Sequence, residues 1–521
     1  MMKKDKLMHT ITDKRASGIL LHVSSLPGEY GIGDLGSSSR NFVDFLASAG
    51  QSYWQILPLV PVSPIFGNSP YMSCSAFAGN PLFISPELLL QDGRIQPSDL
   101  PSYNFSEYVI EFDKVIAQKN TILAVAWRTF QANGTRHNLD GFISANPWVK
   151  DYGLFMALKQ KYNQKAWFQW PEELSRRDPN ALNKTKDQLK QEISYFQFEQ
   201  YLFFSQWQKL HNYANKNGIQ IIGDLPIYVG LDSVDVWANQ NIFELDPKTA
   251  LPTAVAGVPP DYFSKTGQLW GNPLYRWNTT NADVKEQLHN WWVQRLEMIF
   301  STVDVIRIDH FRGFESYWSV PAKEKTAING KWLKGPGIQF FQQMEKRLGK
   351  LPIIAEDLGI ITPAVERLRD ELGFPGMKIL LFAFDGNIDN SYLPYNYTKN
   401  CVVYTGTHDN DTAVGWYLEP EVSREAKRQA KRYANREDNE ASTFSSEMIY
   451  LAHSSTACLS ILPMQDVLGF GNDCRMNTPS TTKNNWQWRC AQRFITDDMA
   501  EQLCESTYIF GRLPTTEKDI E

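Results

Sequence analysis

The sequence predicts an α/β chain folded as a (β/α)8 (TIM) barrel with subdomains inserted in the loops at its C-terminal face. Apolar, β-branched runs bounded by Gly, Pro or Asp recur along the chain, and helix-length amphipathic segments separate many of them. This alternation is typical of βα units. Several runs end in an acidic or polar residue, as expected where catalytic groups sit at the C-terminal ends of barrel strands. A doubly wound open sheet with eight strands is the alternative.

The strand count supports the barrel. The predicted strands lie in eight runs, which in chain order are GILLHV at 18–23, YWQILPL at 53–59, IQIIGDLPIYV at 219–229, VDVIRIDHF at 303–311, PIIAEDL at 352–358, MKILLFAFD at 377–385, CVVYTGTHD at 401–409 and CLSILPMQD at 458–466. Eight is the number of strands that closes this barrel.

Uneven spacing between the runs indicates insertions, because roughly 160 residues separate the second run from the third and one crossover needs far fewer. We predict a single catalytic barrel over residues 1–521. A mostly helical insertion at about 60–215 lies between strands 2 and 3, and an aromatic-rich insertion at about 230–295 lies between strands 3 and 4. The first insertion opens with the Pro-rich PLVPVSPIFGNSPY, which ends in Ser69, Pro70 and Tyr71 near a barrel strand end.

Residues 255–277 of the second insertion are rich in Gly and Pro and are predicted to form a loop. Aromatic side chains on a loop either bind a ligand or pack the loop onto the barrel. The five in question are Tyr262, Phe263, Trp270, Tyr275 and Trp277. Further along, 422–440 is predicted to be a highly charged, solvated helix.

Composition limits the classes of function. A formal net charge of −6 over 521 residues argues against electrostatic binding of nucleic acid. The aromatic share of 13%, with 16 Trp and 22 Tyr, suits either a surface that stacks sugar rings or a large aromatic core. The six cysteines form no C-x-x-C pair and are predicted to be free thiols. The basic N-terminus lacks a following apolar run, and no membrane span is evident, so a cytoplasmic location is predicted.

Three runs carry candidate catalytic acids. Residues two apart in a strand share a face, so Arg307 and Asp309 lie together, and the cation would keep Asp309 ionised. By the same parity Glu356 faces the barrel mouth and the adjacent Asp357 faces outward. Asp409 shares a face with Thr407 in the third run, and His408 lies beside it where the strand turns into a loop. A purely structural Arg–Asp pair is the alternative for the first run.

Two carboxyl groups flanking a sugar–oxygen bond are the usual equipment of glycoside chemistry. Asp309 is therefore predicted as nucleophile, Glu356 as acid/base and Asp409 as a third acid. Binding of a divalent metal by the same acids is the rival use. The nearest calcium-like run, DGNIDN at 385–390, lacks the turn glycine and the bidentate Glu and is predicted to be a polar turn. GIGDLG at 31–36 is predicted to lead into a helix instead of binding a dinucleotide, and neither a cofactor nor a metal is predicted.

At these residues the chain resembles the amylomaltases, or 4-α-glucanotransferases, relatives of the α-amylases. The resemblance runs almost from end to end. It rests on SSLPGEYGIGDLG near the start, NSPYMSCSAFAGNP at 68–81, GDLPIYV at 223–229, GVPPDYFSKTGQLWGNPLY at 257–275, RIDHFRG at 307–313, IAEDLG at 354–359, TGTHDNDT at 405–412 and CRMN at 474–477.

The resemblance implies the same three roles for the acids and adds binding residues. Arg307 and His408 look like donor-subsite partners, and Asp224 looks like a supporting acid on the third strand. Positions implied to bind the glucan are Ser69, Tyr71, Asp261, Tyr262, Phe263, Gln268, Trp270, Asp385 and Asn477.

The implied reaction moves a segment of an α-1,4-glucan to the 4-hydroxyl of another glucan or of glucose, through a covalent glycosyl-enzyme and with retention. Maltooligosaccharides and α-1,4-glucans are the implied donors, with no nucleic-acid or membrane partner. An α-amylase-like hydrolase is the first alternative, because the acids alone do not separate transfer from hydrolysis. A non-catalytic glucan-binding barrel is the second.

Overall fold

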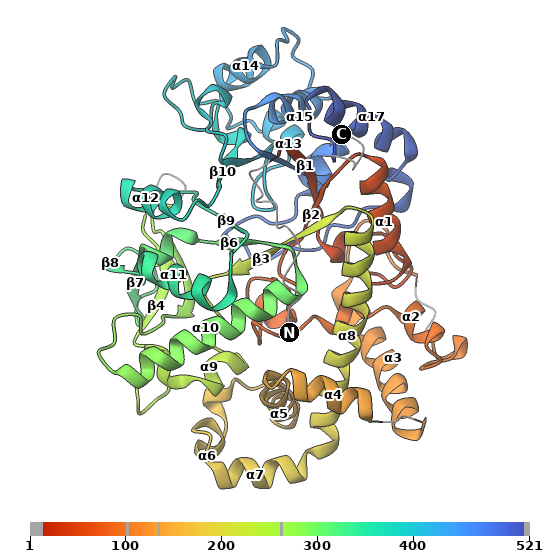
Figure 1. Cartoon of the computed structure of the whole chain (residues 1–521), viewed down its shortest axis with the longest axis vertical. Helices are drawn as coiled ribbons and strands as arrows, with labels where there is room; N and C mark the ends of the chain where they lie inside the picture. The colour runs from red at the N-terminus through yellow and green to blue at the C-terminus, as the bar shows by residue number, and fades with distance from the viewer. Residues whose placement is uncertain (1–13, 101–103, 134–135, 261–263, 515–521) are drawn as a thin grey trace.

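Eight parallel strands close into a barrel in the computed structural model, which describes residues 14–100, 104–133, 136–260 and 264–514 (Figure 1). Neighbours around the barrel follow the order β1, β12, β11, β10, β9, β6, β3, β2 and back to β1. The strands are β1 (Ala16–Leu20), β2 (Tyr53–Gln55), β3 (Gln220–Pro226), β6 (Val305–Asp309), β9 (Ile353–Ala355), β10 (Gly376–Ile379), β11 (Cys401–Tyr404) and β12 (Leu459–Pro463). Each lies in, or overlaps, one of the eight predicted runs, which confirms the predicted barrel.

Strand register places the polar residues of the interior side by side. Asp224 on β3 pairs with Arg307 on β6, and Arg307 in turn pairs with Ile354 on β9. A small residue is required where β1 meets β2, because a Cβ on Gly18 would lie 2.5 Å from the carbonyl oxygen of Tyr53. Gly18 therefore lets the two strands approach closely enough for the barrel to close.

Helices surround the barrel and cover its apolar outer face. The strands bury Ile306 and Ile308 completely or nearly so, while Arg307 between them points inward to Asp224. The helices of this layer are α1 (Ser37–Ser48), α8 (Lys190–Lys216), α10 (Ala282–Thr302), α11 (Gly337–Leu348), α12 (Pro363–Glu371), α15 (Phe444–Ser454) and α17 (Asp497–Ile509). Asn281 caps α10 by accepting the N–H of Val284 at 3.1 Å, which fixes the start of this helix.

Between β2 and β3 the chain forms mostly helices, which occupy the lower part of Figure 1. The helices there, before α8 returns the chain to the barrel, are α2 (Pro86–Gln91), α3 (Phe112–Asn133), α4 (His137–Ala145), α5 (Trp148–Lys161), α6 (Glu172–Ser175) and α7 (Pro179–Gln188). Between β3 and α10 lies the short helix α9 (Val234–Ala238). Three more helices of the C-terminal part are α13 (Ala413–Leu418), α14 (Arg424–Tyr433) and α16 (Met464–Val467).

The prediction that 255–277 is a loop is wrong. Its chain forms two strands of a four-stranded antiparallel sheet with the order β5, β4, β7, β8. These strands are β4 (Ala254–Val258), β5 (Gln268–Pro273), β7 (Ser316–Pro321) and β8 (Lys331–Lys334). The partner strands β7 and β8 come from a further insertion that follows β6 and that the sequence did not reveal. Pairing across the two insertions satisfies the backbone groups of this Gly- and Pro-rich stretch.

The predicted charged helix at 422–440 is shorter and less solvated than expected. Helix α14 ends at Tyr433, and the side chain of Lys431 is only 3% exposed. Its ammonium group lies 3.0 Å from Glu447 and 2.6 Å from Asp438. A buried lysine therefore holds α14 against α15 through paired charges.

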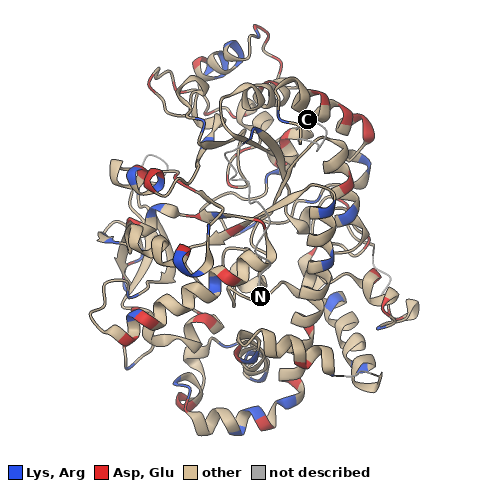
Figure 2. Ribbon diagram, in the orientation of Figure 1, with Lys and Arg blue, Asp and Glu red and all other residues tan. Residues whose placement is uncertain are grey.

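Charged residues of both signs are interspersed along the outer helices (Figure 2). None of the helices in the described ranges is both long and apolar enough to cross a lipid bilayer.

Candidate active site

A buried arginine forms the centre of the polar cluster at the C-terminal ends of the strands. Arg307 Nη1 donates hydrogen bonds to both carboxylate oxygens of Asp224, at 2.8 and 2.7 Å, and to Asp309 Oδ1 at 3.0 Å. Asp224 is completely buried, whereas the Asp309 side chain is 32% exposed. The predicted contact between Arg307 and Asp309 is therefore present, and the exposed acid is the one that a ligand can reach.

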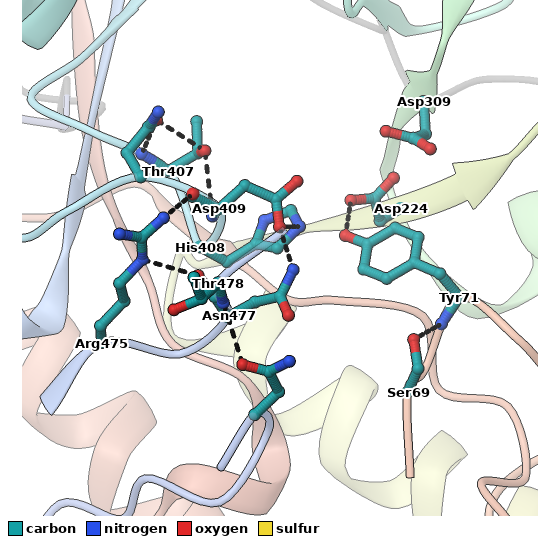
Figure 3. A network of polar contacts seen from close by, with 12 residues as sticks. Ser69, Tyr71, Asp224, Asp309, Thr407, His408, Asp409, Arg475, Asn477 and Thr478 are labelled. Atoms are coloured by element: carbon teal, nitrogen blue, oxygen red, sulfur yellow. Dashed lines mark hydrogen bonds and ion pairs between the residues drawn. The ribbon is translucent and has the colours of Figure 1, made fainter. Parts of the chain in front are cut away.

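One wall of the site is built from aromatic rings. The Tyr71 hydroxyl donates to Asp224 Oδ2 at 2.8 Å, and its ring stacks on the imidazole of His408 at 5.2 Å between centroids (Figure 3). Trp486 packs against both rings, at 5.7 and 6.0 Å. Ser69 shapes the turn before Tyr71, because its hydroxyl accepts the Tyr71 N–H at 3.2 Å. Tyr71 from the N-terminal part of the chain and His408 and Trp486 from the C-terminal part therefore lie beside one another near Asp224.

Two residues of the segment after β12, Asn477 and Arg475, hold Asp409 in place. Asn477 Nδ2 donates to Asp409 Oδ1 at 2.7 Å, and His408 Nε2 lies 3.4 Å from the same oxygen. Arg475 ties the segments together: its Nη2 donates to the Asp409 carbonyl at 2.6 Å, and its Nε donates to the Asn477 carbonyl at 2.7 Å. A third bond joins Arg475 Nη1 to Asp411. Figure 3 shows Asp409, Asn477 and Arg475 on the side of the site opposite Asp309.

This clamp gives a first prediction. Arg475→Ala should lower kcat for the glucan transfer that the family resemblance implies by about 10- to 100-fold, because Asp409, the predicted third acid, would be misplaced. Arg475→Lys should recover little of the loss, since an ammonium group cannot reproduce the forked contacts. Steady-state kinetics with maltotriose, alongside the melting temperature, provide the measurement. If the folded variant keeps the wild-type kcat and only its melting temperature falls, Arg475 has no positioning role.

Glu356 follows β9 and is fixed by two backbone groups. Its Oε2 accepts the N–H of His310 at 2.6 Å, and its Oε1 accepts the N–H of Leu358 at 2.9 Å. His310 has a left-handed backbone with φ of 54°, which turns that N–H back toward the acid. The neighbouring Asp357 is buried in the outer layer, where it accepts the N–H of Met377 at 2.8 Å. The predicted separation of the two adjacent acids is confirmed.

The acids influence one another strongly. Burial raises the pKa of Asp309; Arg307 opposes this effect, while Asp224, Glu356 and Asp409 raise the pKa further. Burial likewise raises the pKa of Glu356 against the opposing effect of Arg307. A low-dielectric site that holds several carboxyl groups disfavours full ionisation, so the pair retains a proton at a higher pH than free carboxyls do.

Two neighbouring groups of the site also have shifted pKa values. Burial alone would lower the pKa of Arg307, but Asp224 and Asp309 raise it well above its ordinary value. Burial lowers the pKa of His408, although Asp409 opposes this change, and the imidazole is therefore neutral at pH 7.

The remaining predicted binding residues have no recorded contact with the three acids among the described residues. Trp270 on β5 meets the ring of His310 edge-on at 4.8 Å, and its indole N–H donates to Gln268 Oε1 at 3.1 Å. Asp385 is exposed in a turn, where it accepts the N–H of Asn387, and no bond joins it to the acids among the described contacts. Asp261, Tyr262 and Phe263 lie outside the described residues.

Aromatic residues of the β4–β5 segment also serve packing. Tyr275 is fully buried, and its hydroxyl donates to the Ile227 carbonyl at 2.9 Å. Trp277 packs against Trp292 of α10 at 5.9 Å. These two residues fix the sheet to the barrel, whereas Trp270 is only half-buried and lies against His310, at the site.

Sequence reasoning missed three residues of the site. Arg475 lies two residues before Asn477, within the CRMN motif that carried part of the family resemblance, so that motif could have indicated it. His310 follows Asp309 directly, but its hydrogen bond to Glu356 depends on a left-handed backbone conformation that the residue type does not predict. Trp486 is more than 400 residues from Tyr71 in the chain, and no local pattern could have paired the two.

A closed (β/α)8 barrel whose acids converge at the C-terminal ends of its strands is an architecture suited to breaking and making glycosidic bonds. Within the described ranges, no three His, Cys, Asp or Glu side chains are grouped as a metal ion would require.

Comparison with known proteins identifies the family. Residues 21–495 match the model of glycoside hydrolase family 77, described as 4-alpha-glucanotransferase. A 4-alpha-glucanotransferase of Synechocystis sp. is 50% identical over 96% of this chain and 98% of the relative, and that of Thermus thermophilus is 44% identical over 91% and 94%. Amylomaltase from Streptococcus agalactiae in complex with acarbose superposes with a TM-score of 0.91 at 40% identity, covering 96% of this chain and all of that one. The chain belongs to the 4-α-glucanotransferase (amylomaltase) family.

Membership confirms the predicted fold and the predicted activity. The chain is a 4-α-glucanotransferase that acts on α-1,4-glucans. A crystal structure of amylomaltase from Corynebacterium glutamicum, at 18% identity and a TM-score of 0.74, shares the fold. Another relative, 42% identical, is the chloroplastic/amyloplastic enzyme DPE1 of Arabidopsis thaliana.

Proposed function

We propose that the enzyme transfers glucan segments by a retaining double displacement. In the first step a carboxylate oxygen of Asp309 attacks the anomeric carbon, the glycosidic C–O bond breaks, and Glu356 gives its proton to the departing 4-oxygen. In the second step Glu356 takes the proton of an acceptor 4-hydroxyl, whose oxygen attacks the same carbon and releases Asp309. Two inversions at one carbon retain the α configuration.

The contrast between the surroundings of Asp309 and Glu356 supports this division of roles. Arg307 donates to Asp309 at 3.0 Å, and this contact favours negative charge on the attacking oxygen. Two backbone N–H groups fix the orientation of Glu356, and although they oppose the effect of burial, its pKa is raised, which suits a group that must carry a proton. Burial raises the pKa of both acids, and we assign the proton that they share to Glu356 because Arg307 donates its hydrogen bond to Asp309.

Asp409 is proposed to bind and distort the donor sugar. Its side chain is 45% exposed, and it lies with His408 and Asn477 facing Asp309 across the site. Acids and amides there can accept from and donate to the sugar hydroxyls nearest the anomeric carbon, so their bonds can tighten as the ring flattens in the transition state. Tyr71, stacked on His408, supplies an apolar face beside them.

Donors and acceptors follow from the reaction. Maltooligosaccharides and α-1,4-glucans are the proposed donors, and glucose or another glucan is the proposed acceptor. Water is abundant at about 55 M, and a sugar prevails only because binding and orientation raise its effective concentration much further. Trp270 and Gln268 offer part of that acceptor surface beside His310. A cytoplasmic location remains a prediction.

Trapping the covalent intermediate tests the mechanism. With 5-fluoro-α-glucosyl fluoride as the substrate, the second fluorine slows both steps. Glu356→Gln lacks the base and therefore slows the second step further. The variant should thus accumulate the ester formed with this reagent. Mass spectrometry of the digested protein should find the added sugar on the peptide that contains Asp309. A label on another acid, or inverted products by NMR, would contradict the proposal. Asp309→Asn treated in the same way is the control and should remain unlabelled.

A further inference from the structure

An exposed tryptophan packs on Arg312, which follows Asp309 in the chain and donates a hydrogen bond to the loop after Glu356. Trp332 on β8 is 38% exposed, and its ring centroid lies 3.8 Å from the guanidinium carbon of Arg312. Arg312 in turn donates from Nη1 to the carbonyl of Ile360, which is 46% exposed. Together Trp332 and Ile360, joined by the buried Arg312, form a surface that we call the Trp332 ledge.

The ledge is rigid. Trp332 packs on Trp318 of β7 with ring centroids 5.1 Å apart and an angle of 64° between the rings, and the two residues pair directly across the strands. Arg312 is only 5% exposed, and its Nη2 also reaches the Ser316 hydroxyl at 3.4 Å. A ring fixed in this way loses little conformational entropy when a ligand stacks against it.

Position in the chain relates the ledge to the acceptor side of the site. Arg312 follows Asp309 by three residues, and Ile360 follows Glu356 by four. A stretch of four residues spans at most about 14 Å, so the Ile360 end of the ledge lies within a few sugar units of Glu356. In the proposed mechanism Glu356 serves the oxygen of the leaving or accepting glucan, and Ile360 lies on the loop that continues from Glu356.

We propose that the Trp332 ledge is an outlying subsite for the acceptor part of an α-1,4-glucan, beyond the units bound next to Glu356. This inference rests on the proposed double displacement. The apolar faces of glucosyl rings stack on exposed indoles, and Arg312 backs the indole with positive charge without reaching solvent. Short acceptors would end before the ledge, whereas longer acceptors would gain this extra contact.

The test separates the acceptor step from the donor step. α-Maltosyl fluoride serves as donor, because fluoride leaves without any sugar on the acceptor side. Initial rates are measured with glucose, maltose, maltotriose and maltohexaose as acceptors. Trp332→Ala should leave the KM for glucose unchanged and raise the KM for maltohexaose about three- to tenfold, the usual range for losing one ring contact. Trp332→Phe should retain most of the wild-type KM.

Controls make the outcome decisive. Tyr508→Ala removes a still more exposed aromatic side chain from α17, on the far side of the barrel from β8 in Figure 1, and should change neither KM. An unchanged KM for maltohexaose in Trp332→Ala, or equal increases for glucose and maltohexaose, would overturn the subsite. An altered oligomeric state with unchanged kinetics would also overturn it and would assign the ledge to a protein contact. Failure of the double displacement would be visible in the wild-type protein, as the absence of retained transfer to any acceptor.

Discussion

Asp309→Asn is expected to lower kcat for transfer from maltotriose by about 10⁴-fold or more, while the protein still folds and binds glucan. The amide has the same shape as the carboxylate but is a far weaker nucleophile, so the glycosyl ester does not form. Arg307 keeps its two bonds to Asp224, and the buried charge therefore remains paired. Initial rates of glucose release and calorimetric titration with maltooligosaccharides measure the two quantities separately.

The control for this change is Asp389→Asn, which neutralises an exposed acid in the turn after β10. Its kcat should equal that of the wild type. Residual transfer by Asp309→Asn above about one-hundredth of the wild-type rate would assign the attack to another acid. Loss of glucan binding together with activity would instead show that Asp309 supports the cluster structurally, which was the alternative that its contact with Arg307 left open.

Much of the barrel could be predicted because its information is local. Each barrel strand lies in or overlaps a short apolar run, and in β6 the inward residues alternate with outward ones, so Arg307 and Asp309 could be assigned to one face from parity alone. The antiparallel sheet could not be predicted, because β4 pairs with β7 across more than 50 residues of intervening chain. β4 and β5 come from a Gly- and Pro-rich stretch that is typical of a loop, and the strand β7 that extends their pairing into a larger sheet is distant in the chain.

The site shows the same limit. The three acids end apolar strands, which is a visible signal, and the family resemblance supplied Asn477 and Tyr71. Contacts that depend on tertiary structure were not visible: Arg475 clamps Asp409 across 66 residues, and the left-handed turn at His310 aims a backbone donor at Glu356. Residue types indicated the proposed reacting groups, whereas the groups that orient them became evident only from the fold.

Glu356→Gln should have a different signature from Asp309→Asn, because the acid/base is needed only where a proton moves. With maltotriose, whose leaving group requires protonation, kcat should fall about 10²- to 10⁴-fold. With α-maltosyl fluoride the first step should stay fast, since fluoride leaves without a proton. Azide, a nucleophile that needs no base, should then accelerate turnover and yield α-maltosyl azide, which mass spectrometry and NMR identify.

The pH profile sharpens this test. In the wild type, kcat/KM for maltotriose should fall at high pH as Glu356 loses its proton, and the raised pKa of this group places that limb above the range of an ordinary glutamate. In Glu356→Gln the same limb should be absent with α-maltosyl fluoride. Asp357→Asn is the matched control: it removes the adjacent acid that pairs with Arg369 in the outer layer. This variant should lose stability but keep the wild-type ratio of fluoride to maltotriose activity, and azide should not accelerate it. Azide rescue in the control, or none in Glu356→Gln, would remove Glu356 from the acid/base role.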